Sequence, residues 1–357
     1  MNRFGERFSF STFGESHGKA LGCIVDGVPA GLIIDETFIQ NEMDRRKPGQ
    51  NAYATARKEG DVVEILSGVF EGKSTGTPIA MVIYNTNQKS KDYDNVKAVF
   101  RPGHADFTYW HKYGIRDYRG GGRSSARETA ARVAAGAVAK LMLRELGIQC
   151  QSGVSAIAGI TAKTIDFNYP AQSEIYALDA TMEATQKIAV LEAKNAHDSV
   201  GGVAIVKISG VPVGLGEPMY HKLDGVLADA MMGLNAVKAV EIGDGFESAR
   251  KRGSDNNDLL RQTGFESNHA GGILGGISNG EEIVITIHFK PTPSIFQAQH
   301  TLNTDNEEIN LELKGRHDPC VAIRGSVVCE SMAALVIADM LLLNMGRRID
   351  AVKRYYI

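Results

Sequence analysis

Cysteine is scarce in this sequence and shows no redox or metal-binding pattern. The four cysteines, Cys23, Cys150, Cys320 and Cys329, lie in unrelated contexts and form no C-x-x-C pair. That spacing excludes a zinc ribbon and gives no sign of a disulfide framework. We therefore expect reduced thiols, no metal site and a cytoplasmic protein.

The sequence also lacks a long unbroken apolar run, a leader pattern and an excess of positive charge. The run Met332–Met345 is interrupted by Asp339 and is too short to span a bilayer. The first residues are polar and do not form a signal-peptide pattern. A formal net charge of −3 argues against bulk binding to nucleic acid or to a membrane surface. We expect a soluble globular protein with no membrane or nucleic-acid partner, in which any basic site is local.

Glycine, by contrast, is abundant and marks an internal repeat. Gly27-Val-Pro-Ala-Gly-Leu32 recurs as Gly210-Val-Pro-Val-Gly-Leu215. A second set of spaced glycines recurs at one constant offset: Gly68, Gly72 and Gly76 match Gly272, Gly276 and Gly280. The matches keep their order, as a duplication with loop insertions would leave them. With apolar runs of strand and helix period, this predicts an α+β fold with pseudo-twofold halves, at about 1–165 and 166–357.

The stretch from Arg119 to Thr129 is typical of an anion site at the start of a helix. Gly120–Gly122 permits close backbone approach, and Ser125 and Glu128 form an S-x-x-E capping box before an alanine-rich helix to about Leu146. Three arginines flank this helix N-terminus: Arg119, Arg123 and Arg127. Free N–H groups and guanidinium groups together suit a phosphate or another oxyanion. The alternative is a glycine turn that leads into a purely structural helix.

Three titratable side chains are candidates for proton transfer. His17 lies in the turn Gly14-Glu-Ser-His-Gly18, and His104 follows Pro102-Gly103. Histidine titrates nearest to neutrality, although either ring could simply lie on the surface. Asp339 has only aliphatic helical neighbours at i±3 and i±4, so we expect a carboxylate without a local partner. It could instead bond to a distant backbone group.

Arginines are concentrated in loops and near helix ends. The set comprises Arg45, Arg46, Arg101, Arg123, Arg127, Arg316 and Arg324. Guanidinium groups bind phosphate and carboxylate through two parallel hydrogen bonds, so this supply predicts a substrate with more than one anionic group. Polar loops at Lys290–Ser294 and Asn235–Lys238 suit the polar edge of a cofactor. The residues alone indicate an enzyme that acts on a small polyanion.

Taken together, these motifs resemble the chorismate synthase family over essentially the whole chain. The resemblance rests on Gly14–Gly18, Phe100–Asp106, Tyr118–Thr129, Asn235–Lys238 with Glu241–Phe246, and Gly315–Arg324. It implies one domain over residues 1–357, folded as a β-α-β sandwich with internal pseudosymmetry and assembled as a homotetramer. It implies a lyase that converts 5-enolpyruvylshikimate 3-phosphate into chorismate and phosphate by anti-1,4-elimination. This last step of the shikimate pathway, which leads to the aromatic amino acids, requires reduced FMN (FMNH2).

The resemblance also implies roles for individual residues. His17 would assist departure of the phosphate, His104 would protonate or hydrogen-bond the flavin, and Asp339 would act with the flavin in removing the C6 proton. The implied FMN contacts are Arg123, Ser124, Ser125, Asn235, Ala236, Gly275, Lys290, Pro291, Thr292, Pro293, Ser294 and Arg316. The implied substrate contacts are Arg46, Arg127 and Arg324. Many members carry a further basic residue where Asn51 and Ala52 stand here, and Arg57 is the candidate replacement.

Two other functions fit parts of the pattern. A flavin-dependent oxidoreductase or flavin reductase acting on a small polyanion would share the FMN site but would turn over NADPH directly. In the elimination enzyme, NADPH serves only as an indirect reductant of FMN. A non-enzymatic phosphate- or RNA-binding module would instead show salt-sensitive nucleic-acid binding, which the net charge disfavours.

Overall fold

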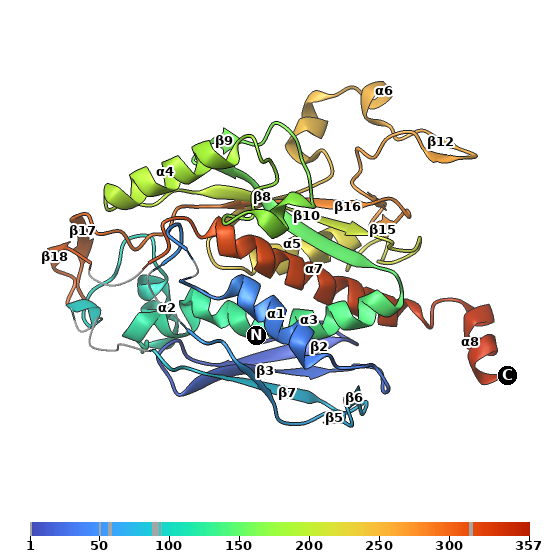
Figure 1. Ribbon diagram of the computed structural model, residues 1–357, viewed down its shortest axis with the longest axis horizontal. Helices are drawn as coiled ribbons and strands as arrows, with labels where there is room; N and C mark the ends of the chain where they lie inside the picture. The colour runs from blue at the N-terminus through green and yellow to red at the C-terminus, as the bar shows by residue number, and fades with distance from the viewer. Residues whose placement is uncertain (1, 50, 56–58, 88–92, 94, 314–316) are drawn as a thin grey trace.

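The computed structural model describes residues 2–49, 51–55, 59–87, 93, 95–313 and 317–357. Two five-stranded antiparallel sheets enclose a layer of helices (Figure 1). The first sheet runs β1 (Arg3–Phe4), β2 (Ser9–Gly14), β3 (Ala20–Asp26), β7 (Ile79–Tyr84) and β4 (Val63–Ile65). The second runs β9 (Ile160–Thr161), β8 (Gln149–Ile157), β10 (Gly202–Ser209), β16 (Ile283–Phe289) and β11 (Val237–Ile242). The predicted β-α-β sandwich is thereby confirmed.

Four helices form the inner layer: α1 (Glu36–Arg46), α3 (Thr129–Glu145), α5 (Leu223–Met232) and α7 (Ala322–Asn344). Helices α3 and α7 cross closely because Gly136 has no side chain; a Cβ there would lie 2.5 Å from the Cβ of Ser331. By length and composition α7 could cross a membrane, but 83% of its most apolar window is buried inside the protein. It is therefore the central core helix, and it begins well before the apolar run in the sequence.

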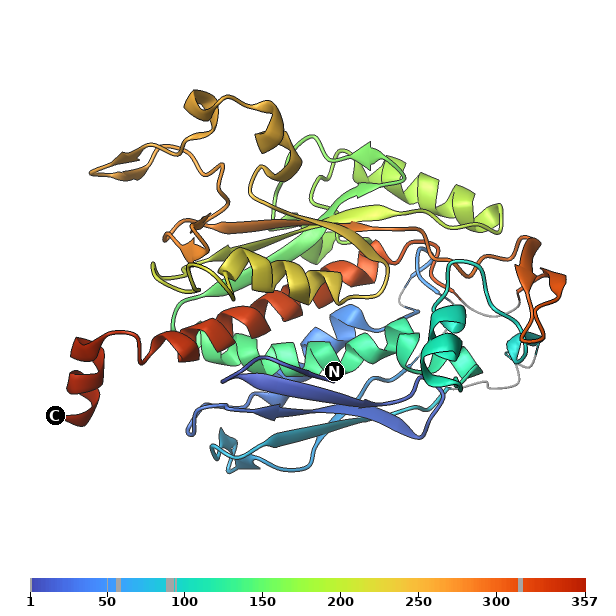
Figure 2. The same cartoon turned by 180° about the vertical axis from the view of Figure 1, so that it is seen from behind.

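The remaining elements lie at the periphery. Helix α4 (Glu183–Asn195) lies on the outer side of the second sheet (Figure 1). The others are α2 (Asp106–Tyr113), α6 (Gly253–Asn256), α8 (Ile349–Tyr356) and the hairpins β12–β13 (Leu260–Arg261, Gly264–Phe265) and β17–β18 (Gln299–Leu302, Glu308–Leu311). Figure 2 shows α8 projecting from the body at the end of α7.

The internal duplication is visible in the topology. Strands β2, β3 and β7 are neighbours in the first sheet, as β8, β10 and β16 are in the second. Each half also carries a short glycine hairpin, β5–β6 (Val69–Phe70, Lys73–Ser74) or β14–β15 (Ile273–Leu274, Ile277–Ser278). Strand β8 belongs to the second sheet, and the division of the two halves at about residue 165 stays a prediction.

The same hydrogen bonds recur in the two hairpins. The hydroxyl of Ser74 accepts from the N–H of Leu32 and donates to the carbonyl of Pro29. The hydroxyl of Ser278 accepts from the N–H of Leu215 and donates to the carbonyl of Pro212. The matched glycines all have positive φ, which a residue with a side chain rarely adopts. The glycine repeat in the sequence therefore records a conserved turn geometry.

Local helix signals are confirmed in part. Asp35 accepts a hydrogen bond from Phe38 N at the start of α1, and Gly147 has a φ of 71° just beyond α3. The capping box is wrong in detail. Ser125 accepts from Arg127 N at the start of a short 3-10 turn, while Glu128 bonds to Thr12 and Arg132.

Candidate active site

A cavity of about 390 Å³ opens where loops of both halves meet at one end of the inner helices. Most of the predicted site residues line it: Arg46, His104, Ser124, Ser125, Arg127, Asn235, Ala236, Lys290, Thr292, Pro293, Ser294 and Arg324. Among the described lining residues, five are cations, namely Arg46, Arg101, Arg127, Lys290 and Arg324, and one, Asp318, is a carboxylate. The cavity is therefore built for anions, and its volume is in the range of small-molecule sites.

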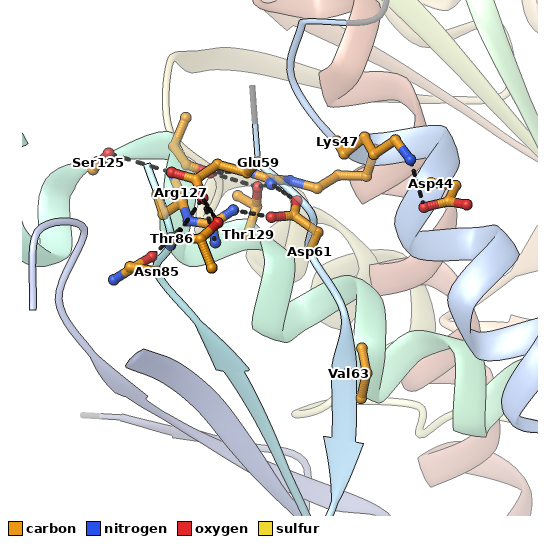
Figure 3. A network of polar contacts seen from close by, with 12 residues as sticks. Asp44, Lys47, Glu59, Asp61, Val63, Asn85, Thr86, Ser125, Arg127 and Thr129 are labelled. Carbon is orange, nitrogen blue, oxygen red and sulfur yellow. Dashed lines mark hydrogen bonds and ion pairs between the residues drawn. The ribbon is translucent and has the colours of Figure 1, made fainter. Parts of the chain in front are cut away.

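Two of the cations share one buried carboxylate. One oxygen of Asp61 lies 2.9 Å from Nη1 of Arg46, and its other oxygen accepts from Nη1 of Arg127. Figure 3 shows Arg127 between Asp61, Asn85 and Ser125, with Val63 at the start of β4 below them. Arg46 reaches this point because it is the last residue of α1, where it also donates to the Oγ1 of Thr129 at 3.1 Å.

The electrostatics of this group follow from burial and proximity. Burial alone would raise the pKa of Asp61, but Arg46 and Arg127 outweigh it and hold that pKa below its ordinary value. Burial, with further repulsion from Arg324 and Arg127, lowers the pKa of Arg46 to about 9, against the opposing attraction of Asp61. At neutral pH the group therefore consists of charged guanidinium groups around one charged carboxylate.

His104 belongs to a second charged group, on the loop before α2. Its Nδ1 lies 3.1 Å from Oδ1 of Asp106, and Arg101 binds the same carboxylate at 2.6 and 2.9 Å. Burial would raise the pKa of Asp106, but hydrogen bonds from Arg101 and His104 hold it well below its ordinary value. Burial and the charge of Arg101 lower the pKa of His104 despite its hydrogen bond to Asp106. Nδ1 of His104 faces both Oδ1 of Asp106 and, at 3.2 Å, Nη2 of Arg101; the tautomer with Nδ1–H donates to Asp106 and leaves Nε2 as an acceptor.

The second half contributes a carboxylate, an arginine and a histidine. Asp318 accepts from Nη2 of Arg324 and, at 3.2 Å, from the backbone N–H of Thr55. His317 also lines the cavity and packs against Phe296, with ring centroids 5.7 Å apart. Burial and the charges of Arg101 and His104 lower the pKa of His317 to about 4, although Asp318 opposes them.

His17 lies directly behind the cavity wall. A Cβ on Gly120, which lines the cavity, would lie 2.0 Å from Nδ1 of His17. The ring also meets Tyr93, another lining residue, edge to face with centroids 4.9 Å apart. Gly120, Gly121 and Gly122 all have positive φ, so this turn requires glycine both for its backbone and for its contact with the histidine.

Some predicted contacts lie elsewhere. Arg123 donates to the Oγ1 of Thr12 at 2.6 Å, and neither it, Gly275 nor Pro291 lines the cavity. The Nδ2 of Asn51 donates to the carbonyl of Glu174, and the carbonyl of Ala52 accepts from Nζ of Lys194. Two predicted contacts, Arg316 and Arg57, lie outside the described residues.

Asp339 has partners that its helical neighbours did not reveal. Its carboxylate accepts three backbone N–H groups from the segment before β2, those of Glu6, Arg7 and Phe8, at 2.7 to 2.9 Å. In the part of the chain that the structure describes, Asp339 thus has no hydrogen-bond partner on its own helix, as expected, and the alternative of a bond to distant backbone is confirmed. The structure does not bring Asp339 to the cavity.

Sequence reasoning missed three acidic residues of the site. Asp106 and Asp318 fall within motifs that carried the resemblance, so their position beside His104 and Arg324 was a usable signal. Asp61 carried none, because its partners lie 15 and 66 residues away along the chain. No group of metal-ligating side chains able to hold an ion occurs in the part of the chain that the structure describes.

Polar side chains that line the cavity have atoms that can still bind a ligand. The Nδ2 of Asn235 donates to the carbonyl of Ser124 at 2.8 Å, which joins the two halves at the cavity. Three buried polar atoms of lining residues have no hydrogen-bond partner among the described residues: Oγ1 of Thr292, Nε of Arg324 and Nη2 of Arg127. Buried polar atoms are seldom left unpaired, so these atoms mark positions for ligand groups.

Comparison with known proteins identifies the family. The chorismate synthase family model matches residues 8–342. The chorismate synthases of Sulfurimonas denitrificans and Aliarcobacter butzleri are 70% and 67% identical, in each case over 100% of this chain and 99% of the relative. A crystal structure of chorismate synthase superposes with a TM-score of 0.76 at 34% identity, covering 99% of this chain and 97% of that one. The chain therefore belongs to the chorismate synthase family of lyases.

Proposed function

We propose that this chain converts 5-enolpyruvylshikimate 3-phosphate into chorismate and phosphate by anti-1,4-elimination. The observation that carries the proposal is the cavity lined by five cations and one carboxylate. The substrate bears a phosphate and two carboxylates. Binding it therefore needs several side chains that remain positively charged in a buried site. A neutral or monoanionic substrate would leave most of them without a partner.

The arginines divide between the anionic groups of the substrate. Arg46, Arg127 and Arg324 all line the cavity and come from both halves. Guanidinium groups bind phosphate and carboxylate in a fixed orientation, so these three would hold the ring with the phosphate and the C6–H bond on opposite faces. This orientation is the requirement of an anti elimination.

The elimination balances without a net change in oxidation state. The C6–H bond breaks and its electron pair forms a C1–C6 double bond. The π pair of the existing C1–C2 double bond moves between C2 and C3, and the C3–O bond breaks with its pair leaving on the phosphate. His17, behind Gly120, would donate a proton or a hydrogen bond to the departing phosphate. Asp318, the lining carboxylate of the described wall, replaces Asp339 as our candidate to accept the proton released at C6.

The residues present fit FMN. Asn235, Lys290 and Thr292 offer amide, ammonium and hydroxyl groups along one wall, and the hydroxyl of Thr292 has no partner in the described chain. Ser124, Ser125, Ala236, Pro293 and Ser294 complete this wall. When bound, reduced FMN supplies electron density to the allylic system as the phosphate leaves. His104 would hydrogen-bond the flavin through Nε2 while Asp106 holds Nδ1.

The proposal also covers the oligomeric state, the cellular compartment and the source of reducing equivalents. We assign a homotetramer in the cytoplasm, with NADPH acting only as an indirect reductant of FMN. Exposed apolar side chains such as Met219, Tyr220 and Tyr356 support association between copies. Burial raises the pKa of the Cys23, Cys150 and Cys320 thiols to about 12, which suits unreactive reduced cysteines.

Anaerobic incubation with the substrate tests the reaction. Phosphate release is measured with FMN alone, with dithionite alone and with both. We expect release only with both, and equal release with oxidised FMN alone would contradict the proposal. NADPH consumption without phosphate release would favour the oxidoreductase alternative, which the named relatives do not favour.

A further inference from the structure

Asp61 is a buried carboxylate that none of the roles above uses. It lies in the loop just before β4, and its side chain is fully shielded from solvent. Each of its two oxygens accepts from a different arginine, Arg46 or Arg127, and both arginines line the cavity. Asp61 itself does not line the cavity. Any effect of Asp61 on the cavity therefore passes through the two arginines.

The backbone at Asp61 is unusual as well. Its φ is 48°, in the left-handed region that residues with side chains seldom adopt. Its carbonyl accepts from Nε2 of Gln40 on α1, at 3.3 Å. A glycine would adopt this backbone without strain but would supply no carboxylate. Strained backbone persists where the surrounding structure requires it, most often at functional sites.

The two arginines differ in how many of their guanidinium nitrogens have hydrogen-bond partners. Arg46 uses all three nitrogens of its guanidinium group, with Asp61, Thr129 and the carbonyl of Ala126 as acceptors. Arg127 donates from Nε to Asn85 and from Nη1 to Asp61. Its Nη2 is buried without a hydrogen-bond partner among the described residues, and Glu59 is 3.9 Å away. Of the six guanidinium nitrogens in the pair, Nη2 of Arg127 is therefore the one without a hydrogen-bond partner in the described chain, and its ion pair with Glu59 at 3.9 Å is too long to be a hydrogen bond.

We propose that Asp61 is a positioning residue that fixes Arg46 and Arg127 as a pair and thereby presents Nη2 of Arg127 to an anionic group of the substrate. The inference rests on the proposed function, because it concerns how that substrate is held. Two guanidinium groups this close repel each other, and a shared carboxylate is what allows them to lie side by side. The depressed pKa of Asp61, which Arg46 and Arg127 cause against the effect of burial, keeps that carboxylate charged at neutral pH.

A competing effect predicts the opposite sign. Removing the carboxylate adds one unit of positive charge near the cavity, which by itself would attract a polyanion and lower KM. Asparagine, however, turns one oxygen into an NH2 group, which faces an arginine donor and displaces it. Displacing an arginine N–H donor should weaken substrate binding more than the added positive charge strengthens it, so we expect KM to rise. The direction of the change in KM therefore decides between the two effects.

The test compares Asp61→Asn with a matched control. Asparagine tolerates positive φ, so the backbone should survive. We expect the KM for 5-enolpyruvylshikimate 3-phosphate to rise about 10-fold or more while kcat changes less than about 3-fold. The control is Glu330→Gln, because Glu330 is a buried carboxylate that also pairs with two cations, Arg45 and Lys140, but does not line the cavity. It should lower the melting temperature and leave KM unchanged.

Two further measurements separate positioning from mere stability. In an Arg127→Ala background, adding Asp61→Asn should change KM by a clearly smaller factor than it does alone, because much of its effect passes through that arginine. Asp61→Gly, whose backbone suits a φ of 48°, should regain substrate affinity on addition of formate but not of chloride. This variant also serves if Asp61→Asn fails to fold.

The outcomes are distinguishable from failure of the proposed function. If the unmodified chain releases no phosphate under reducing conditions, the function itself is wrong. If it is active but Asp61→Asn keeps or lowers KM, the positioning role is overturned. The same holds if the two substitutions are additive in KM, or if formate has no effect on Asp61→Gly.

Discussion

The two halves share one strand order but contribute different chemistry to the cavity. Each half brings an arginine near the start of its long inner helix, Arg127 before α3 and Arg324 within α7, and each arginine pairs with a carboxylate. The ends of the other inner helices differ. Helix α1 ends in Arg46, whereas α5 is followed by the amide Asn235. Duplication thus repeated the scaffold, and we propose that the differences at the helix ends divide the cavity between substrate-binding arginines and a polar, flavin-binding wall.

The largest effect expected from this division is on Arg127. Arg127→Ala should weaken substrate binding by about 2–5 kcal/mol, which is about 30-fold to about 4,000-fold, because it removes a buried charge-assisted contact. FMN affinity should change far less, since most of the proposed flavin contacts, among them Asn235, Lys290 and Thr292, belong to the other half. Titration of each ligand checks this, and Asn235→Ala is the reciprocal variant. Intact substrate affinity with a loss of flavin binding in Arg127→Ala would invert the assignment of the two walls.

The next effect is the dependence of stability on pH, to which His317 of the second half and Asp61 of the first half contribute in different pH ranges. The pKa of His317 is lowered to about 4 in the folded chain, below about 6.5 in the unfolded chain. The unfolded chain therefore binds more protons between these values, and stability falls as the pH decreases through that window, by about 3 kcal/mol. Asp61 has a depressed pKa, so its contribution is lost only below about pH 4.

Chemical denaturation of the unmodified chain and of His317→Gln at pH 7, 5.5 and 4.5 measures this effect. The variant should lose most of the pH dependence above pH 4.5. A dependence of unchanged size in His317→Gln would mean that other groups carry it.

The two histidines of the first half should have similar effects on rate. His17→Ala and His104→Ala should each slow turnover about 10²-fold, the usual size of general acid–base catalysis. Single-turnover phosphate release measures the step directly. His111→Ala is a control, since His111 packs on Phe107 in α2 and does not line the cavity. A normal rate in either variant would return that histidine to a structural role.

Asp339→Asn addresses the carboxylate that the structure moves away from the cavity. Asparagine keeps one oxygen to accept from the N–H groups of Glu6, Arg7 and Phe8, but its NH2 opposes them. We expect a loss of roughly 2 kcal/mol in the free energy of unfolding and an unchanged rate per folded molecule. Thermal unfolding and single-turnover rate on one preparation decide the matter. A normal stability with abolished elimination would restore a catalytic role for Asp339.

The sequence revealed the parts of the site that local patterns encode. Glycine spacing, the Arg119–Thr129 stretch and the arginines at helix ends are visible within a few residues, and they predicted the duplication and most lining residues. Asp61 and Asp339 could not be found in this way. Asp339 meets backbone more than 330 residues away, and Asp61 acquires its partners only when α1 and α3 pack together. Neighbours at i±3 and i±4 say nothing about such contacts.

The smallest expected effect tests whether the halves are equivalent in energy as well as in geometry. Ser74→Ala and Ser278→Ala each remove one hydroxyl that accepts from a backbone N–H and donates to a carbonyl. Both serines are buried, so each variant should lose about 1 kcal/mol of the free energy of unfolding, measured in urea. The serines share no partner, so the double variant should be additive within about 0.5 kcal/mol. Neither lines the cavity, so KM should not change. A cost that differs between them by more than about 1 kcal/mol would show that the two hairpins kept their shape while their contributions to stability diverged.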